Sequence, residues 1–147
     1  MIEAAVFCLA LNIYYEARNQ PVVGQIAVSQ VVLHRVKDKR YPNTVCKVVR
    51  QAKYSKGGTI PVRHKCQFSW FCDGKSDRPL EKDAFRWSVS LSKRILAGEF
   101  ADLVDGSTHY HSDKVNPKWS VNKKEIGKIG DHIFYRWEQK RKRGQGG

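Results

Sequence analysis

The chain has 147 residues, of which 41% are hydrophobic, 28% charged and 11% aromatic. This length suits one ordinary domain with its own core and is short for two, and the composition excludes a disordered chain. The 27 basic residues outnumber the 14 acidic ones and give a net charge of +13. Apolar stretches end well before the roughly 18 residues that a membrane span requires. We expect a monomer with a single domain over residues 1–138, a basic flexible tail over residues 139–147, and no transmembrane segment.

The first predicted element is a helix from Ile2 to Ala17 that ends at a lone carboxylate. Between Ala4 and Tyr15, Asn12 is the only side chain with an amide or charged group, so the helix is expected to be buried nearly all round. Glu16 lies where this burial ends. Apolar surroundings disfavour a charged carboxyl and raise its pKa, which allows it to donate a proton near neutral pH. A glycosidic general acid needs this property.

A structural role is the alternative for Glu16, because it could pair with Arg18 or another cation at the helix end. Its isolation favours catalysis. Between Glu16 and Asp73 the only other acid is Asp38.

Two further helices are predicted in the front half of the chain. Pro21 suits the first turn of a helix that runs to about Lys39. Thr44 is the expected N-cap of a short third helix through Arg50, whose inward-facing residues are predicted to be Val45, Val48 and Val49. Residues 51–65 are basic and contain glycine and proline, which is typical of an exposed loop.

The rest of the chain is predicted to combine one helix with three strands. Residues 67–71 suggest a strand with alternate side chains facing the core and a cleft. A helix is expected from Leu80 to Ala97, with an inner stripe made of Ala84, Trp87, Leu91 and Ile95. Strands are expected at Thr108–His111 and Ile129–Tyr135, paired with each other.

The four cysteines form no Cys-x-x-Cys pair, so a structural zinc knuckle is not expected. Cys8 is interpreted as a small core residue of the first helix. Cys66 and Cys72 are close enough in sequence for a small loop disulfide, but the lack of a secretion signal favours free thiols.

The basic excess favours a polyanionic partner. Ten basic side chains lie between Arg35 and Lys65, and five more between Arg136 and Arg143. Nucleic acid, an anionic bacterial envelope and simple solubility are the three interpretations. Envelope attraction ranks above nucleic-acid binding, because the aromatic residues do not interleave with the basic ones in a stacking pattern.

A secretory signal would begin with a basic region, yet the first basic residue is Arg18. No signal peptide is therefore expected.

Several blocks of sequence together resemble the SleB/CwlJ-type cell-wall hydrolases. The blocks follow the family's order over nearly the whole chain, and they are residues 11–18, 24–28, 31–36, 41–46, Cys66–Trp70, Thr108–His111 and Ile129–Tyr135. The resemblance implies an α+β, mainly helical, lysozyme-like domain with a small antiparallel β-sheet. It also implies cleavage of peptidoglycan glycan strands, typically as a lytic transglycosylase.

With such an activity, we expect the protein to be made in the cytoplasm of an infected or producing bacterium and to act on the cell wall. Lysis, assisted export and origin as a fragment of a longer protein are the three routes to the wall, and the first suggests a phage endolysin.

In that resemblance Glu16 aligns with the catalytic glutamate. The family usually continues with Gly-Glu where this chain has Asn19-Gln20, so a second nearby acid is missing. The family's Asn-Arg pair is His34-Arg35 here. These departures favour a mechanism with one glutamate and no cofactor, in which the substrate's own 6-hydroxyl traps the reactive centre.

The predicted site therefore has Glu16 as its catalytic residue and no metal. The candidate substrate contacts are Tyr15, Gln67, Phe68, Ser69, Tyr110, His111 and Tyr135. Two rival functions remain open. One is a zinc amidase or peptidase that uses His109 and His111 with Asp113, His64 or His132, and the other is a non-enzymatic module that binds nucleic acid.

Overall fold

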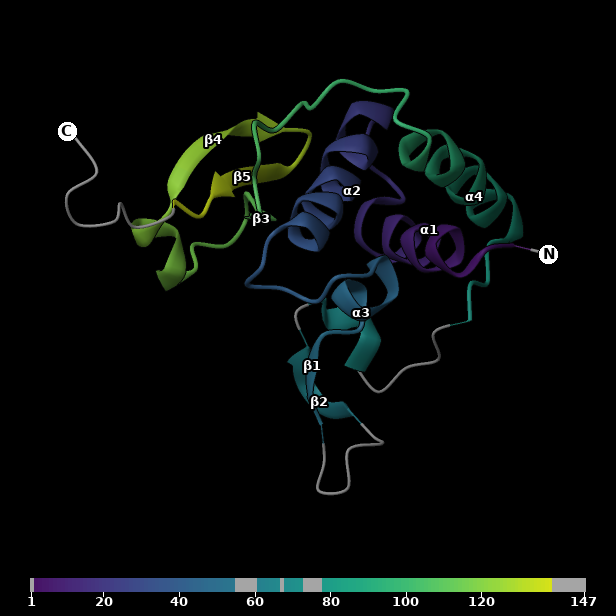
Figure 1. The fold of residues 1–147 in the computed structure, drawn as a ribbon, viewed down its shortest axis with the longest axis horizontal. Coiled ribbons are helices and arrows are strands. Elements are labelled where there is room, and N and C mark those ends of the chain that lie inside the picture. The colour runs from purple at the N-terminus through teal and green to yellow at the C-terminus, as the bar shows by residue number, and fades with distance from the viewer. Residues whose placement is uncertain (1, 55–60, 67, 73–77, 139–147) are drawn as a thin grey trace.

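The computed structural model describes residues 2–54, 61–66, 68–72 and 78–138. Figure 1 shows a mainly helical molecule with two small antiparallel sheets. The elements in chain order are α1 (Ala4–Ala17), α2 (Val22–Lys37), α3 (Val45–Val49), β1 (Ala52–Tyr54), β2 (Pro61–Cys66), the 3-10 helix η1 (Ser69–Cys72), α4 (Lys82–Leu96), β3 (His109–Ser112), the 3-10 helix η2 (Lys118–Asn122), β4 (Lys124–Ile129) and β5 (His132–Arg136). The predicted α+β class with a small antiparallel sheet is confirmed.

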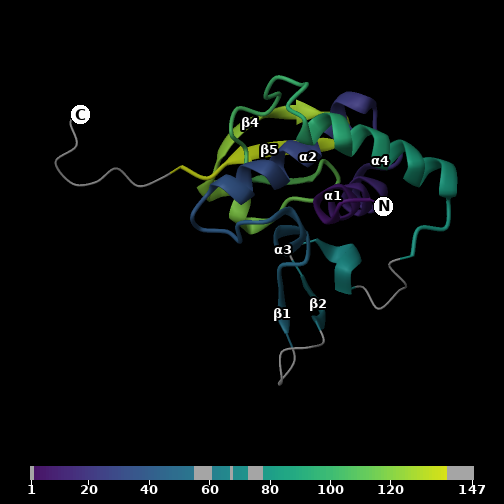
Figure 2. The same ribbon diagram turned by 45° about the vertical axis from the view of Figure 1, so that its right-hand side comes forward.

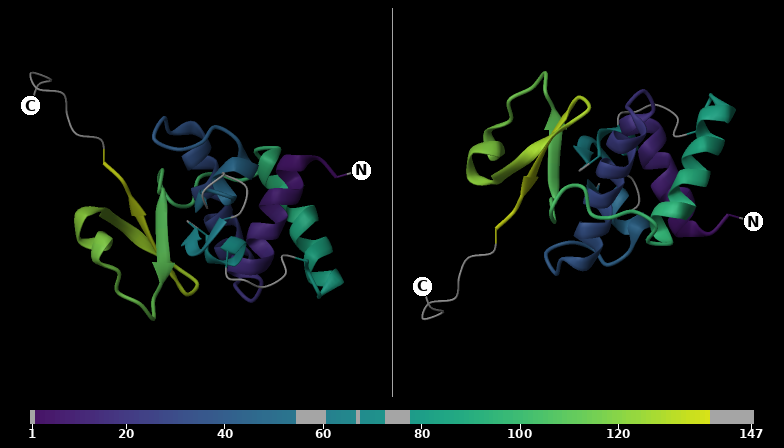
Figure 3. Two further views of the ribbon diagram at one scale, coloured as in Figure 1. Left: turned by 90° about the horizontal axis from the view of Figure 1, so that it is seen from below. Right: turned by 90° about the horizontal axis from the view of Figure 1, so that it is seen from above.

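Helix α1 lies at the centre of the helical layer. Both views of Figure 3 show the three-stranded sheet, α2, α1 and α4 following one another across the molecule. Apolar side chains of all these helices and of α3 form one core, in which Leu9, Ile13, Val32, Val48 and Leu91 are almost fully buried. Because this core surrounds α1, few positions of the helix face solvent, which explains why it carries so few polar residues.

The predicted ends of the helices agree with the structure to within a few residues. Thr44 caps α3, because its hydroxyl accepts a hydrogen bond of 3.1 Å from the backbone nitrogen of Lys47. The three valines predicted to face inward from α3 are buried.

The three-stranded sheet has the order β3-β5-β4 and is antiparallel throughout. The predicted pairing of the two strands is confirmed, and Tyr110 lies opposite Phe134. Strand β4 was not predicted. It joins β5 through a turn that contains Gly130, whose φ of 58° favours glycine.

Three predictions about local structure are wrong. The loop expected over residues 51–65 contains β1 and β2, which pair as a hairpin that projects from the helices (Figures 1 and 2). The strand expected over residues 67–71 is replaced by η1. Trp87, which was expected on the inner stripe of the last helix, is 44% exposed, and its indole nitrogen donates a 2.8 Å hydrogen bond to Oε1 of the buried Gln25.

Cys8 is buried in the core as expected, but it is more than a small core residue, because a disulfide joins it to Cys46 of α3. The side chains of Cys66 and Cys72, Gln67 and the tail over residues 139–147 lie outside the described part of the chain. Among the helices that are described, none is long and apolar enough to cross a membrane.

Candidate active site

Glu16 lies in the last turn of α1, at the boundary between the buried part of the helix and solvent. Its side chain is half-buried. Burial raises the pKa of the Glu16 carboxyl above its ordinary value, while the Tyr110 hydroxyl and the positive charge of Arg35 act in the opposite direction. The group therefore combines a tendency to stay protonated with access to a reactant.

Tyr110 approaches Glu16 from strand β3. Burial raises the pKa of its hydroxyl well above the ordinary value, and the neighbouring Glu16 carboxyl raises it further. The hydroxyl stays protonated at neutral pH and can therefore act only as a hydrogen-bond donor or acceptor. The Tyr110 ring packs beside Phe68, with ring centres 6.4 Å apart, and beside Phe134 at 5.7 Å.

Arg35 approaches the same place from the last turn of α2. Its side chain is only 5% exposed. Its Nε donates a 2.7 Å hydrogen bond to the backbone oxygen of Thr108, and its guanidinium lies over the rings of Tyr41 and Phe68 at 4.9 and 5.3 Å. Three separate segments of the chain thus enclose one positive charge beside Glu16.

One wall of the site is held in place by Trp70 of η1. Its indole stacks on Tyr15, with ring centres 5.3 Å apart, and its nitrogen donates a 2.9 Å hydrogen bond to Oδ1 of Asn12. Asn12 has no exposed surface. The one amide in the apolar stretch of α1 therefore fixes η1 against the helix that carries Glu16.

The structure brings together only part of the predicted site. Tyr15, Phe68 and Tyr110 lie around the end of α1 with Glu16. Gln67 and the side chain of Ser69 fall outside the described residues, so their predicted contacts cannot be placed here.

His111 and Tyr135 lie on the other face of the three-stranded sheet. Successive residues of a strand point to opposite faces, and Tyr110 takes the face toward the helices. The His111 ring stacks on that of Tyr135, and its Nε2 accepts a 2.8 Å hydrogen bond from the Tyr135 hydroxyl if Nδ1 donates to the backbone oxygen of Ser112 at 2.7 Å. Their predicted role in substrate binding stays a prediction.

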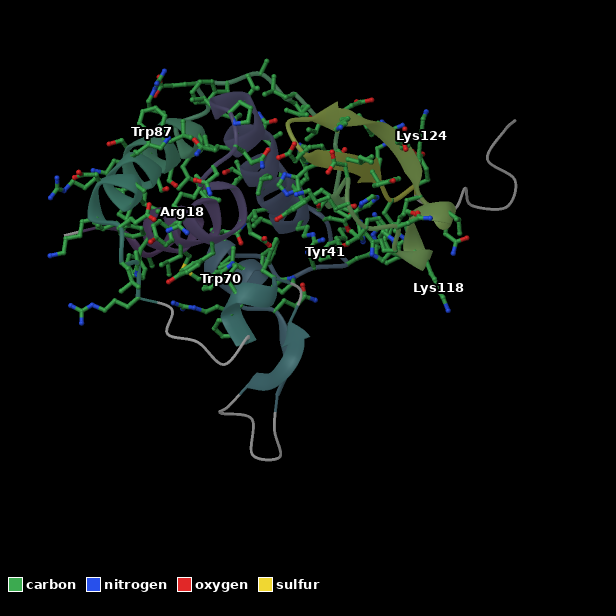
Figure 4. All side chains as sticks on the ribbon, turned by 180° about the vertical axis from the view of Figure 1, so that it is seen from behind. Arg18, Tyr41, Trp70, Trp87, Lys118 and Lys124 are labelled. Carbon is green, nitrogen blue, oxygen red and sulfur yellow. A yellow bond between two sulfur atoms is a disulfide. The ribbon has the colours of Figure 1, made fainter. Side chains whose placement is uncertain are left out.

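A second aromatic cluster continues from this face. His109 packs against Trp119 and Trp137, and burial together with nearby basic side chains lowers its pKa to about 3. Lys123 and Arg40 lie over the Trp137 ring at 4.7 and 4.0 Å. Figure 4 shows Lys118 and Lys124 at this end of the molecule and Trp87 at the opposite end.

The histidines do not assemble a metal site in the described part of the chain. No group of three potential metal ligands is found among these residues. Both ring nitrogens of His111 are hydrogen-bonded, and Nδ1 of His109 lies 2.9 Å from the Thr108 hydroxyl. The zinc alternative gains no support from this geometry.

The family to which the chain belongs follows from comparison with known proteins. The model of the Cell Wall Hydrolase family matches residues 19–135. The chain belongs to the cell wall hydrolase family. The match begins just after Glu16, so the role of that residue depends on its geometry and on the resemblance of residues 11–18.

Two curated relatives of this cell wall hydrolase are spore cortex-lytic enzymes. The one from Bacillus cereus is 27% identical over 133 residues, which cover 86% of this chain and 42% of that protein. The one from Halalkalibacterium halodurans is 29% identical over 127 residues, covering 86% and 33%. The chain therefore spans less than half the length of these relatives.

Two solved structures share the fold of this cell wall hydrolase. The catalytic domain of the Bacillus cereus SleB protein superposes with a TM-score of 0.62 at 25% identity, covering 92% of this chain and 93% of that one. The catalytic domain of the germination-specific lytic transglycosylase SleB from Bacillus anthracis gives 0.62 at 26% identity, covering 91% and 96%. The predicted lysozyme-like fold is confirmed.

The structure of the cell wall hydrolase shows the contacts of two residues, Arg35 and Gln20, that could not be derived from the sequence. In the sequence Arg35 belongs only to a family motif, although a basic residue four and three positions after Val31 and Val32, on the same helix face, was a usable signal. Gln20 stands where the resemblance places an acid. Its side chain makes two hydrogen bonds to Asp131 in the β4–β5 turn, at 3.1 and 2.9 Å.

Proposed function

We propose that the chain is a peptidoglycan-cleaving enzyme that breaks the bond between N-acetylmuramic acid and N-acetylglucosamine with Glu16 as its single catalytic carboxyl. The observation that carries the proposal is the environment of Glu16, a half-buried carboxyl at the end of α1 whose pKa is raised by burial. The names of the relatives, which include a lytic transglycosylase, support the same reaction class.

In the proposed reaction, protonated Glu16 donates its proton to the bridging oxygen as the glycosidic bond breaks. The glutamate is now a carboxylate, and the muramic acid carries an oxocarbenium-like centre at C1. The 6-hydroxyl of the same sugar attacks C1 and returns its proton to Glu16. The products are a 1,6-anhydro sugar and a new sugar hydroxyl, and the enzyme regains its starting state.

The charges around Glu16 favour this route over a two-carboxylate hydrolysis. Among the described residues, Tyr110 and Arg35 perturb the Glu16 carboxyl and no second acid does. Gln20, which stands where the family has an acid, is held by Asp131. A lytic transglycosylase needs no second carboxylate, because the nucleophile belongs to the substrate.

Digestion of purified peptidoglycan followed by mass spectrometry tests the proposal. Anhydro ends are expected from the wild-type protein, and Glu16→Gln is expected to abolish their release while the protein stays folded. Glu3→Gln is the matched control, because Glu3 is an exposed glutamate at the start of the same helix. Reducing ends would point to hydrolysis instead, and free peptides to an amidase. If Glu16→Gln kept more than a few per cent of wild-type activity, the assignment of Glu16 as the catalytic residue would be contradicted.

We also propose that the protein acts at the cell wall, outside the reducing cytoplasm, and that its basic surface attracts anionic envelope polymers. The Cys8–Cys46 disulfide supports an oxidising compartment.

The anionic partner is supported by a hollow of about 490 Å³ on the surface. It is lined by His34, Lys37, Asp38, Lys39, Gly106 and Thr108. Binding to teichoic acid that weakens steeply with salt is the expected result, and salt-independent binding would contradict it. The endolysin role stays a prediction.

A further inference from the structure

Arg35 is a charged side chain in a place where charge is costly. It is 5% exposed, and burial lowers the pKa of its guanidinium from the ordinary value. A buried charge is tolerated when nearby groups of opposite charge and hydrogen bonds compensate it. A residue that served only solubility would keep its charged end in water.

The residues around Glu16 identify which carboxyl compensates this charge. Glu16 is faced by Tyr110 from β3 and by Arg35 from α2, and Arg35 is the only cation that acts on its carboxyl among the residues described. Arg18, two residues further along the chain, is directed elsewhere. Its guanidinium lies 3.5 Å from Glu81 and over the Tyr14 ring at 4.2 Å.

Arg35 is also fixed to the strand that carries Tyr110. Successive side chains of α2 contact successive backbone oxygens before β3, because Nδ1 of His34 lies 2.7 Å from the oxygen of Ser107 and Nε of Arg35 lies 2.7 Å from that of Thr108. Nε2 of His34 also lies 3.1 Å from Asp102. The end of α2 thus sets the position of the strand that faces Glu16.

We propose that Arg35 is a positioning residue that stabilises the Glu16 carboxylate during the reaction and holds it in register with Tyr110. The inference rests on the proposed function. In that reaction the glutamate begins as a neutral acid, passes through a carboxylate and becomes neutral again. Apolar burial favours only the neutral form, whereas a fixed positive charge stabilises the carboxylate that exists after proton donation. An interaction that strengthens as the reaction proceeds raises kcat more than it changes KM.

Two substitutions of Arg35 separate charge from packing. Arg35→Met removes the charge at similar length, and Arg35→Lys keeps it. The Glu16 carboxyl is followed by NMR in protein labelled with ¹³C at the glutamate carboxyls, with Glu16→Gln used to assign its signal. Arg35→Met is expected to shift the Glu16 titration upward by about 1–3 pH units. Its kcat on peptidoglycan is expected to fall about 100-fold with KM little changed.

Arg35→Lys is expected to keep the titration within about half a unit of wild type and to lose only about tenfold in kcat, since the charge remains while the hydrogen bond to Thr108 changes. His34→Gln is the matched control. It disturbs the neighbouring bond to Ser107 without removing the charge beside Glu16, so the Glu16 titration is expected to stay in place.

An unchanged Glu16 titration in folded Arg35→Met would overturn the inference. If Arg35→Met does not fold, Arg35→Lys alone tests the inference. A complete loss of kcat in Arg35→Lys with an unchanged Glu16 titration would overturn it, because the charge would then be present without supporting the reaction and Arg35 would serve packing alone. A shifted titration with unchanged kcat would overturn the catalytic part. Failure of the proposed function is a separate result, since it is read from wall cleavage by Glu16→Gln and not from the titration.

Discussion

The indole nitrogen of Trp70 donates a 2.9 Å hydrogen bond to Oδ1 of Asn12, and both side chains are buried. Trp70→Phe is expected to lower the free energy of unfolding by about 1–3 kcal/mol, because the Asn12 oxygen loses its partner inside the core. Urea denaturation measures the change. Trp137→Phe, at a residue that is 38% exposed, is the control and should cost much less.

A double variant tests whether the Trp70 effect comes from the hydrogen bond. Replacing both partners with apolar groups removes the unpaired oxygen, so Trp70→Phe combined with Asn12→Leu should cost less than the two single changes added together. Strict additivity would show that the bond contributes nothing beyond packing.

The raised pKa of Glu16 predicts that this carboxyl, the proposed catalytic group, destabilises the protein at neutral pH. A carboxyl whose folded pKa lies above its ordinary value of 4.5 contributes stability below that value, and the contribution is lost as the pH rises through the folded pKa. Glu16→Gln cannot ionise. It should become increasingly more stable than wild type as the pH rises from about 4 to 8. Melting temperatures across this range provide the measurement, and a constant difference would contradict the assignment.

Reduction of the Cys8–Cys46 disulfide should weaken the fold. The bond closes a loop between residues that are 38 apart in sequence, and loop-closure entropy gives an expected loss of about 3–4 kcal/mol in the free energy of unfolding. The comparison is best made in a Cys66→Ser/Cys72→Ser background, where the added reductant acts on one pair alone. Equal stability of the oxidised and reduced proteins would argue against the bond.

Gly130 and Gly98 allow the contribution of the β4–β5 turn to be separated from backbone strain. Both have positive φ, at 58° and 77°. A Cβ at Gly98 meets nothing within 4 Å, whereas one at Gly130 collides with the side-chain oxygen of Gln20. Gly98→Ala should cost about 1 kcal/mol from strain alone. Gly130→Ala should cost about 1 kcal/mol more, because it also breaks the hydrogen bonds between Gln20 and Asp131.

The Gln20→Ala background provides the decisive comparison for the turn. With the Gln20 side chain removed, Gly130→Ala should cost no more than Gly98→Ala. An excess that persists in this background would place the cost in the turn itself.

Local sequence patterns predicted those parts of the fold that depend on neighbouring residues. Helices α1, α2 and α4 follow from apolar spacing, and the hydroxyl of Thr44 caps α3 as its position before three valines indicates. Hairpin β1–β2 has a basic sequence without alternation, and its strands form through pairing with each other. The Cys8–Cys46 pairing was hidden for a related reason, because four cysteines allow several connectivities that only the fold can decide.

The candidate site likewise contains one residue that local sequence indicates and one that only the folded structure reveals. Glu16 could be proposed from one helix, since an isolated acid after an apolar stretch has a local signature. Arg35 could not, because its burial is created by Thr108, Tyr41 and Phe68, which lie in distant parts of the chain. A charge on an inner helix face is recognisable as functional only when its surroundings are known.

Glu16 and Arg35 both lie between Cys8 and Cys46, so the disulfide encloses them in one covalent ring of backbone. Hydrolysis of any single peptide bond inside this ring leaves the two chain pieces joined. A protease that cut the α1–α2 turn, or the connection between α2 and α3, would therefore produce a nicked protein that still migrates as one molecule until it is reduced. Neither residue could leave the protein through a single cut.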